Sequence, residues 1–283
     1  MKPKKVCIIY SGQTRLYNED YSLFESHKKL ADELKTRYNI DVDFIGHTWS
    51  DQPAPFNVND FTHFMQEPQS IIDDWVNTNF FKRAWWDPNN PEFENFYKEN
   101  FKNKNANAVI EKIFENSRHA YGQIFSFFNC ISQIENTYDA YFRTRWDIKI
   151  LKTQGLAEFF PYAIGENDNK RLVLFDGRAW IKPVSHDSRI NNNVVTTTFL
   201  NDQNFLINHK AMWSYLQMDY LNELHWNIVR SPYNDSKPSS HTLWTAMHPT
   251  NIEGRFVLQG DCYKIIRNDY GVKDKQEKNK WSI

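Results

Sequence analysis

The stretch Tyr138-Asp139-Ala140-Tyr141-Phe142-Arg143-Thr144-Arg145-Trp146-Asp147-Ile148 decides how the rest of the chain is interpreted. Its side chains alternate with a period of two, which predicts a β-strand with two different faces. One face carries Ala140, Phe142, Thr144, Trp146 and Ile148, and the other carries Tyr141, Arg143, Arg145, Asp147 and Lys149. Buried charges need partners, so the arginines and the aspartate either pair with one another or bind a ligand. We favour a ligand.

The amino-terminal part of the chain predicts a βαβ unit. Val6–Tyr10 is a continuous apolar run that ends at Ser11-Gly12, which is typical of a strand buried on both faces in a parallel sheet. Apolar residues recur at helical spacing from about Tyr21 to Tyr38. A second strand follows at Val42–Gly46 and leads into His47-Thr48-Trp49.

The middle of the chain is less regular. Prolines interrupt Gln52–Asn107, which we interpret as a variable excursion of short helices over or beside a site. Val109–Asn136 has helical periodicity and runs directly into the arginine-bearing strand. This order of helix and strand is that of a further α/β unit.

The carboxyl-terminal part predicts further strands at Leu172–Phe175, Phe256–Leu258 and Tyr263–Arg267, and a helix over His209–His225. No internal repeat or change of composition marks a linker, so a single domain over 1–283 is expected. Within it, 1–150 would be the ligand-binding half, 151–270 the catalytic half and 271–283 a flexible tail.

Composition limits the class of protein. The chain is 40% hydrophobic and 24% charged, as in soluble globular proteins. A net charge of -1 gives no general attraction to nucleic acid or anionic membrane, so DNA is a disfavoured partner, although this alternative stays open. The 3 cysteines match no zinc motif or disulfide framework, which favours reduced thiols and a cytoplasmic setting. No segment is long enough to predict membrane insertion.

Common catalytic motifs are absent from the sequence. It contains no G-x-x-x-x-G-K-[ST], no G-x-G-x-x-G after the first strand, and no H-E-x-x-H, which argues against P-loop kinases, ordinary dinucleotide dehydrogenases and one class of zinc protease. It also lacks the G-x-S-x-G elbow of many hydrolases.

Four segments together resemble one group of enzymes. They are Val6–Arg15, Val42–Trp49, Tyr138–Ile148 with its Y-D-x-x-x-R-x-R-x-D pattern, and Asp202-Gln203 with Met212 and Tyr215. They are similar to GT-A-like glycosyltransferases of bacterial surface-polysaccharide clusters, including WavE-like proteins, and of phages and large viruses. The resemblance covers about the first fifty residues and roughly Val109–Tyr220.

The resemblance implies a fold, a reaction and a setting. The fold is a GT-A-like, Rossmann-type mixed α/β sheet flanked by helices. The reaction moves a sugar from a nucleotide-diphosphate donor to a hydroxyl acceptor, such as a glycan or polysaccharide. The setting is the cytoplasm of a bacterium or of a virus-infected host.

The same resemblance implies a place for a metal ion. GT-A enzymes use a D-x-D-type element at a strand end to hold Mn²⁺ or Mg²⁺ and the donor, and Asp147 occupies the corresponding place. Arg145 stands where the first acid would be, which puts metal dependence in doubt. Arg143 and Arg145 would then replace the metal as a phosphate clamp. The alternative is an internal Arg–Asp salt bridge.

Two strand ends supply further candidates for donor or phosphate binding. Ser11, Gly12, Gln13 and Arg15 lie past the carboxyl end of the first strand, where open α/β sheets bind ligands. The alternative is a plain tight turn. His47 and Trp49 follow the second strand and would offer a hydrogen bond and a stacking surface. Their alternative is a satisfied histidine and a core tryptophan.

Asp202 is the candidate general base, since an inverting transfer needs a carboxylate near the attacking hydroxyl. Asp176, which precedes Gly177 after a predicted strand, is its rival. A helix or turn cap is the structural alternative for Asp202. Two other functions stay open: a phage-type transferase that acts on modified DNA bases, and a non-catalytic nucleotide- or carbohydrate-binding module. Asp147 locked to Arg145 would favour the binding module.

Overall fold

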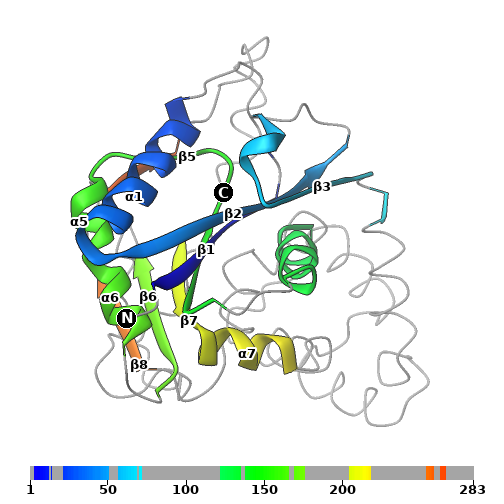
Figure 1. The fold of residues 1–283 in the computed structure, drawn as a ribbon. Helices are drawn as coiled ribbons and strands as arrows, with labels where there is room; N and C mark the ends of the chain where they lie inside the picture. Colours follow the sequence, from blue (N-terminus) through cyan, green and yellow to red (C-terminus); the bar gives the residue numbers. More distant parts are fainter. Residues whose placement is uncertain are drawn as a thin grey trace, which may run out of the picture.

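The structure is a computed structural model that describes residues 3–12, 14, 22–50, 57–68, 70–71, 122–134, 138–165, 169–175, 204–217, 253–257 and 262–265. Its largest element is a seven-stranded sheet with the order β3-β2-β1-β4-β7-β6-β8 (Figure 1). The strands are β1 (Lys4–Ser11), β2 (Ile40–Trp49), β3 (His63–Glu67), β4 (Ala140–Thr144), β6 (Arg171–Phe175), β7 (Phe205–Asn208) and β8 (Glu253–Val257).

One strand of this sheet runs against the others. β3, β2, β1 and β4 pair in parallel, and β7 is antiparallel to both β4 and β6. β8 pairs in parallel with β6, so β6 and β8 have the direction of β4. The predicted mixed α/β sheet is therefore confirmed. The carboxyl ends of all strands except β7 lie at one edge, where β7 has its amino end.

The predicted βαβ unit is also confirmed. β1 and β2 are joined by α1 (Ser22–Tyr38). Val6–Tyr10 are fully buried, because β1 is an inner strand of the sheet and both faces of the sheet are covered there. α1 ends at Asn39, which has φ 52 and donates its N–H to the Lys35 carbonyl at 3.1 Å. Asparagine tolerates this left-handed conformation better than most residues, so it suits the end of a helix.

Helices cover both faces of the sheet. Adjacent residues of a strand point to opposite faces: the Phe142 ring contacts Phe160 of α6 (Phe159–Ile164), whereas the Tyr141 ring stacks on His209 of α7 (His209–Gln217). α1 and α5 (Thr153–Ala157) lie on the side of α6 (Figure 1). A helix over 122–132 lies on the α7 side, where its Gln123 reaches Arg143.

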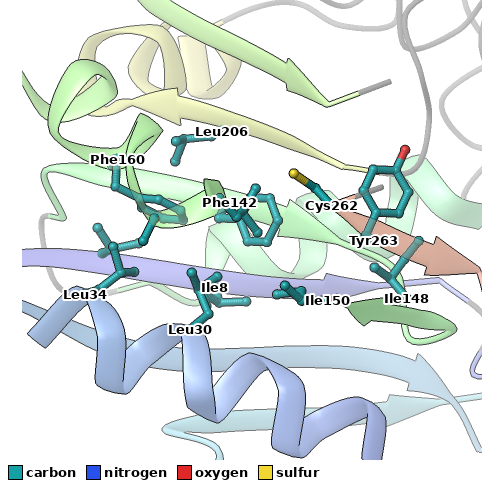
Figure 2. Close-up of a cluster of buried hydrophobic side chains, with 14 of the residues drawn as sticks. Ile8, Leu30, Leu34, Phe142, Ile148, Ile150, Phe160, Leu206, Cys262 and Tyr263 are labelled. Atoms are coloured by element: carbon teal, nitrogen blue, oxygen red, sulfur yellow. The ribbon is translucent and has the colours of Figure 1, made fainter. Parts of the chain in front are cut away.

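The main core lies between the sheet and the layer of α1, α5 and α6. Its side chains come from segments far apart in sequence, including Ile8, Leu30, Leu34, Phe142, Phe160 and Leu206 (Figure 2). Burying such a side chain contributes about 1.5–3 kcal/mol relative to leaving it exposed. This core fixes β1 and β4 side by side, and so fixes the ends of these two strands.

The stretch Tyr138–Ile148 was predicted to be one strand, but the structure divides it. β4 ends at Thr144, Trp146 and Asp147 form a turn, and β5 (Ile148–Ile150) belongs to a separate antiparallel pair with β9 (Tyr263–Ile265). The strand ends because of Trp146. Its ring stacks on the Tyr10 ring with 4.8 Å between the ring centroids, and its Nε1–H donates to the His47 carbonyl at 3.0 Å. The strand prediction therefore holds only along β4, while Trp146 and Ile148 still lie in the same core cluster as Ala140 and Phe142.

Two strands of the sheet, β3 and β7, were not predicted. β3 forms the sheet edge and lies within the stretch that we interpreted as an excursion of short helices, preceded by the 3-10 turn Val58–Asp60. The three cysteines are free and buried, as predicted. In the described part of the chain, no helix has both the length and the apolar character needed to cross a bilayer.

Candidate functional site

The sheet has a topological switch point between β1 and β4. From β1 the chain builds outward through β2 and β3, and then returns to place β4 on the other side of β1. Ligands of open α/β sheets bind at such a point, past the carboxyl ends of the strands. Ser11 ends β1, Gly12 directly follows it, and Arg143 lies near the end of β4, so these predicted residues come together there. Gln13 and Arg15 lie outside the described residues.

Arg143 connects the two strands that flank the switch point. Its side chain is fully buried, and its Nε donates to Ser11 Oγ at 3.0 Å. Its Nη2 donates to Gln123 Oε1 at 3.4 Å. The guanidinium is therefore held between the end of β1 and the 122–132 helix, with its plane fixed by at least two of its N–H groups.

Gly12 forms the turn that leaves β1. Its φ of +102 lies in the region that favours glycine. Its N–H donates to Ser126 Oγ at 2.7 Å. The Gly12 amide is therefore already hydrogen-bonded to the 122–132 helix. The role of Gly12 at this edge of the sheet is to set the direction in which the chain leaves β1.

His47, near the end of β2, is buried and hydrogen-bonded at both ring nitrogens. Nδ1 lies 2.9 Å from Ser126 Oγ, and Nε2 lies 2.9 Å from Glu67 Oε2 at the end of β3. Burial lowers the pKa of His47, and the hydrogen bond to Glu67 opposes that effect. We therefore assign a neutral ring that donates Nε2–H to Glu67 and accepts the Ser126 hydroxyl proton at Nδ1.

Trp49 is a buried side chain and presents no open stacking surface. Its ring stacks on Phe125 at 6.0 Å and meets the His47 ring edge-on at 5.0 Å. These contacts agree with the alternative for both residues, in which Trp49 is part of the core and His47 is satisfied by protein partners.

Arg145 and Asp147 pair with each other across the turn after β4. Arg145 Nε donates to Asp147 Oδ1 at 2.9 Å, and Nη2 donates to Oδ2 at 2.6 Å. Asp147 is fully buried and Arg145 is 7% exposed. The bidentate geometry is that of a strong, charge-assisted pair, which is the salt-bridge alternative for this stretch.

This pair does not fit a divalent cation at Asp147. A metal ion there needs a carboxylate oxygen to coordinate it, and both oxygens already accept hydrogen bonds from a positively charged guanidinium. Within the described ranges, no group of three or more His, Cys, Asp or Glu residues could hold a metal ion. As placed in the structure, the Asp147 carboxylate and the Arg145 guanidinium are therefore committed to each other.

Asp176 and Asp202, the two candidate bases, lie outside the described residues, but the strand ends beside them are defined. β6 ends at Phe175, and β7 begins at Phe205. Because β7 is antiparallel, both ends lie at the edge that carries Ser11 and Arg143. Asn204 confirms this position, since its Oδ1 accepts a hydrogen bond from Thr144 Oγ1 at 2.7 Å.

Sequence reasoning missed the side chains that join this edge together. They are Gln123, Ser126 and Asn129 on the 122–132 helix, and Glu67 on β3, which accepts hydrogen bonds from His47 and Asn129. Polar residues at intervals of three in an otherwise apolar helix were the available signal. Residues three apart lie on the same face of a helix. Because the residues around them are apolar, this face is predicted to be buried.

Comparison with known proteins gives distant structural likenesses. No family model matches the chain, and no curated protein matches its sequence. Among solved structures, galactosyltransferase LgtC with donor and acceptor sugar analogs has 9% identity and a TM-score of 0.39, over 88% of this chain and 72% of that chain. Mouse xyloside xylosyltransferase 1 has 10% identity and a TM-score of 0.39, over 87% and 81% of the two chains.

A third solved structure, 4-diphosphocytidyl-2C-methyl-D-erythritol synthase from Anaerococcus prevotii, has 10% identity and a TM-score of 0.37, over 94% of this chain and 92% of that chain. Likenesses at this level do not establish a shared fold or activity. The function of the chain is therefore inferred from its own residues and topology.

Proposed function

We propose that the chain is a nucleotide-sugar-dependent glycosyltransferase that moves a sugar from a nucleotide-diphosphate donor to a hydroxyl acceptor of a glycan or polysaccharide. The observation that carries the proposal is the meeting of Ser11, Gly12 and Arg143 at the switch point between β1 and β4. Ligands of open α/β sheets bind at this place. The resemblance of the strand-end sequences to GT-A-like enzymes supports the type of reaction.

Arg143 is assigned to the donor diphosphate. The leaving nucleoside diphosphate gains negative charge as the glycosidic bond breaks, and a fixed guanidinium stabilises that charge without reorganising. Ser11 and Gln123 already hold Arg143 in one orientation. Asp202 is proposed to take the proton of the acceptor hydroxyl, with Asp176 as the rival base.

No step is assigned to Mn²⁺ or Mg²⁺. Either ion would supply Lewis-acid stabilisation of the diphosphate, but coordination at Asp147 requires that carboxylate to leave Arg145. We therefore propose that Arg143 neutralises the charge of the diphosphate.

A non-catalytic nucleotide- or carbohydrate-binding module is the second candidate function. The observation that favours it is the Arg145–Asp147 pair, which leaves no acidic group of this turn directed to a ligand. The DNA-modifying alternative has no such support, and the net charge of -1 disfavours it.

A thermal-shift screen tests the proposal. UDP-, GDP- and CMP-sugars and the free nucleoside diphosphates are added to wild type, Arg143→Lys and Arg37→Lys, each with Mn²⁺ or with EDTA. Arg37 is a partly exposed residue of α1 and serves as the control. A ligand at a hundred times its Kd adds about 2.7 kcal/mol of stability. We expect one donor to stabilise wild type and Arg37→Lys in EDTA, and to stabilise Arg143→Lys much less.

The donor found in this way is then tested for turnover. Release of nucleoside diphosphate in the presence of a hydroxyl acceptor supports the transferase. Binding without release, over a panel of glycan acceptors, supports the binding module instead. Absence of a thermal shift with every nucleotide contradicts the transferase and a nucleotide-binding module, and leaves a carbohydrate-binding module as the favoured function.

A further inference from the structure

The 122–132 helix presents a polar stripe, defined here as Gln123, Ser126 and Asn129, to the carboxyl ends of four adjacent strands. Gln123 binds Arg143 of β4, Ser126 binds Gly12 after β1 and His47 of β2, and Asn129 donates to Glu67 of β3. The same helix buries the apolar side chains of Ile124, Phe127 and Ile131. Burying polar groups is costly unless they are hydrogen-bonded, and here each partner lies at the proposed ligand edge.

Ser126 is the centre of this stripe. Its side chain is fully buried, and Oγ lies 2.7 Å from the Gly12 nitrogen, 2.9 Å from His47 Nδ1 and 3.2 Å from the His47 carbonyl oxygen. A hydroxyl has one proton to donate and two lone pairs that accept. Gly12 N–H uses one lone pair, so the hydroxyl proton goes either to Nδ1 or to the carbonyl.

The protonation of His47 decides between these two arrangements. In the neutral ring, Ser126 donates to Nδ1, and the His47 carbonyl still accepts Trp146 Nε1–H at 3.0 Å. In the protonated ring, Nδ1–H donates to Ser126, whose hydroxyl then turns to the carbonyl. The groups that face the His47 side chain are the Glu67 carboxylate, the Ser126 hydroxyl, and the Trp49 and Phe125 rings. In both arrangements the Gly12 amide keeps its acceptor.

We propose that Ser126 is a positioning residue of the ligand edge: its hydroxyl, oriented by His47, holds the Gly12 amide and so keeps Ser11 in place against Arg143. This inference rests on the proposed function, in which Arg143, held by Ser11, binds the donor diphosphate. In this role Ser126 acts through Gly12 and does not itself contact the donor. Its loss therefore affects ligand affinity through the position of the turn.

The test compares three variants on one helix. Ser126→Ala removes the hydroxyl, Ser126→Thr keeps it, and Ser132→Ala is the control, because Ser132 is exposed and its hydroxyl donates to the Asn129 carbonyl of its own helix at 3.0 Å. The probes are inorganic pyrophosphate and UDP, measured by calorimetry well below the unfolding temperature. A lost hydrogen bond is worth about 0.5–1.5 kcal/mol, so Ser126→Ala should bind about threefold to tenfold more weakly. Ser126→Thr and Ser132→Ala should stay within about twofold of wild type on the same scale.

A spectroscopic readout separates positioning from general stability. Long-range ¹H–¹⁵N spectra report which ring nitrogen of His47 carries the proton, and we expect the Nε2–H tautomer at neutral pH. Ser126→Ala should shift the Nδ1 resonance and the Gly12 amide, whereas Ser132→Ala should shift neither. If Ser126→Ala does not fold, Ser126→Cys is measured in its place, and a loss of affinity in the same direction is expected because a thiol is a weaker hydrogen-bond acceptor than a hydroxyl.

The outcomes distinguish the inference from the function on which it rests. If wild type and Ser126→Ala bind the probes with the same affinity, the positioning role is overturned and the proposed function still stands. The positioning role is also overturned if Ser126→Thr binds as weakly as Ser126→Ala while both fold. Absence of binding of both probes to wild type overturns the phosphate site and the positioning role together.

Discussion

At the scale of single residues, the Arg145–Asp147 pair places two charges where little water reaches them. Removing one partner of such a pair leaves an uncompensated buried charge, which costs about 3–5 kcal/mol. We expect Asp147→Ala to lose about that amount of unfolding free energy in urea. Lys4→Ala breaks the half-exposed pair with Asp139 and should cost less than about 1 kcal/mol.

The Arg145→Met/Asp147→Leu double variant completes this experiment. It removes both charges and keeps apolar volume, and such replacements are often close to neutral. The double variant should therefore be more stable than Asp147→Ala alone. Equal losses for Asp147→Ala and Lys4→Ala would show that Asp147 is not a structural anion.

His27 predicts a dependence of stability on pH. Its ring is buried, its Nδ1–H donates to the Leu23 carbonyl at 3.0 Å, and its Nε2 has no hydrogen-bond partner among the described residues. Burial lowers the pKa of His27 from 6.5 to about 4. Below pH 6.5 the unfolded chain therefore binds a proton that the folded chain excludes until about pH 4, and stability falls across this window.

The size of the effect follows from that shift. At about 1.4 kcal/mol per pH unit, His27 should remove up to about 3 kcal/mol of stability between the two limits. The free energy of unfolding is measured for wild type and for His27→Leu from pH 7 to pH 4. Over this range the wild type should lose more unfolding free energy than His27→Leu, and the difference should be this amount. Parallel curves would contradict a neutral buried imidazole.

At the scale of elements, the turn after β4 depends on a glycine in β2. A Cβ atom at Gly46 would lie 2.6 Å from Trp146 Cη2 and 2.9 Å from Cζ2, closer than side chains pack. Gly46→Ala should therefore cost about 1–3 kcal/mol through overpacking, measured as a lower Tm. In a Trp146→Phe background the same substitution should cost less, because the clashing ring atoms are gone. An unchanged Tm for Gly46→Ala in wild type would disprove the close packing.

The same turn shows what the sequence can and cannot predict. β1, α1 and β2 were predictable because an apolar run and a helical period are local signals. The end of β4 was not, since the alternation from Ala140 to Ile148 continues smoothly past Thr144. What ends the strand is the burial of Trp146 against Tyr10, a contact between residues more than a hundred positions apart.

The candidate site divides in the same way. Ser11, Gly12 and His47 could be placed at one edge, because each directly follows a predicted strand of the βαβ unit. Arg143 could not be placed at a strand end, because the predicted strand continued to Ile148. The pairing of Arg145 with Asp147 was an open alternative. Ser126 and Glu67 could not be assigned, because their partners come from other elements.

At the scale of the whole molecule, the three thiols report on global unfolding. Cys7, Cys130 and Cys262 are free and buried, and burial raises the pKa of Cys7 and of Cys130. Only a thiolate in contact with solvent attacks a disulfide reagent. We expect all three to resist Ellman's reagent in the native protein at pH 8 and to react fully in denaturant. Fast reaction of one native thiol would show that its surroundings open without unfolding of the whole chain.

The reversed direction of β7 has a consequence for how this scaffold can diversify. Because β6 ends and β7 begins at the same edge, the connection between these two neighbouring strands never has to cross the sheet. The geometry of the sheet therefore sets no minimum length for a crossing at this connection. Each doubling of the length of a flexible loop costs only about 0.6 kcal/mol in closure entropy. A longer, shorter or unrelated segment at this place would leave the strands that carry Ser11 and Arg143 unaltered.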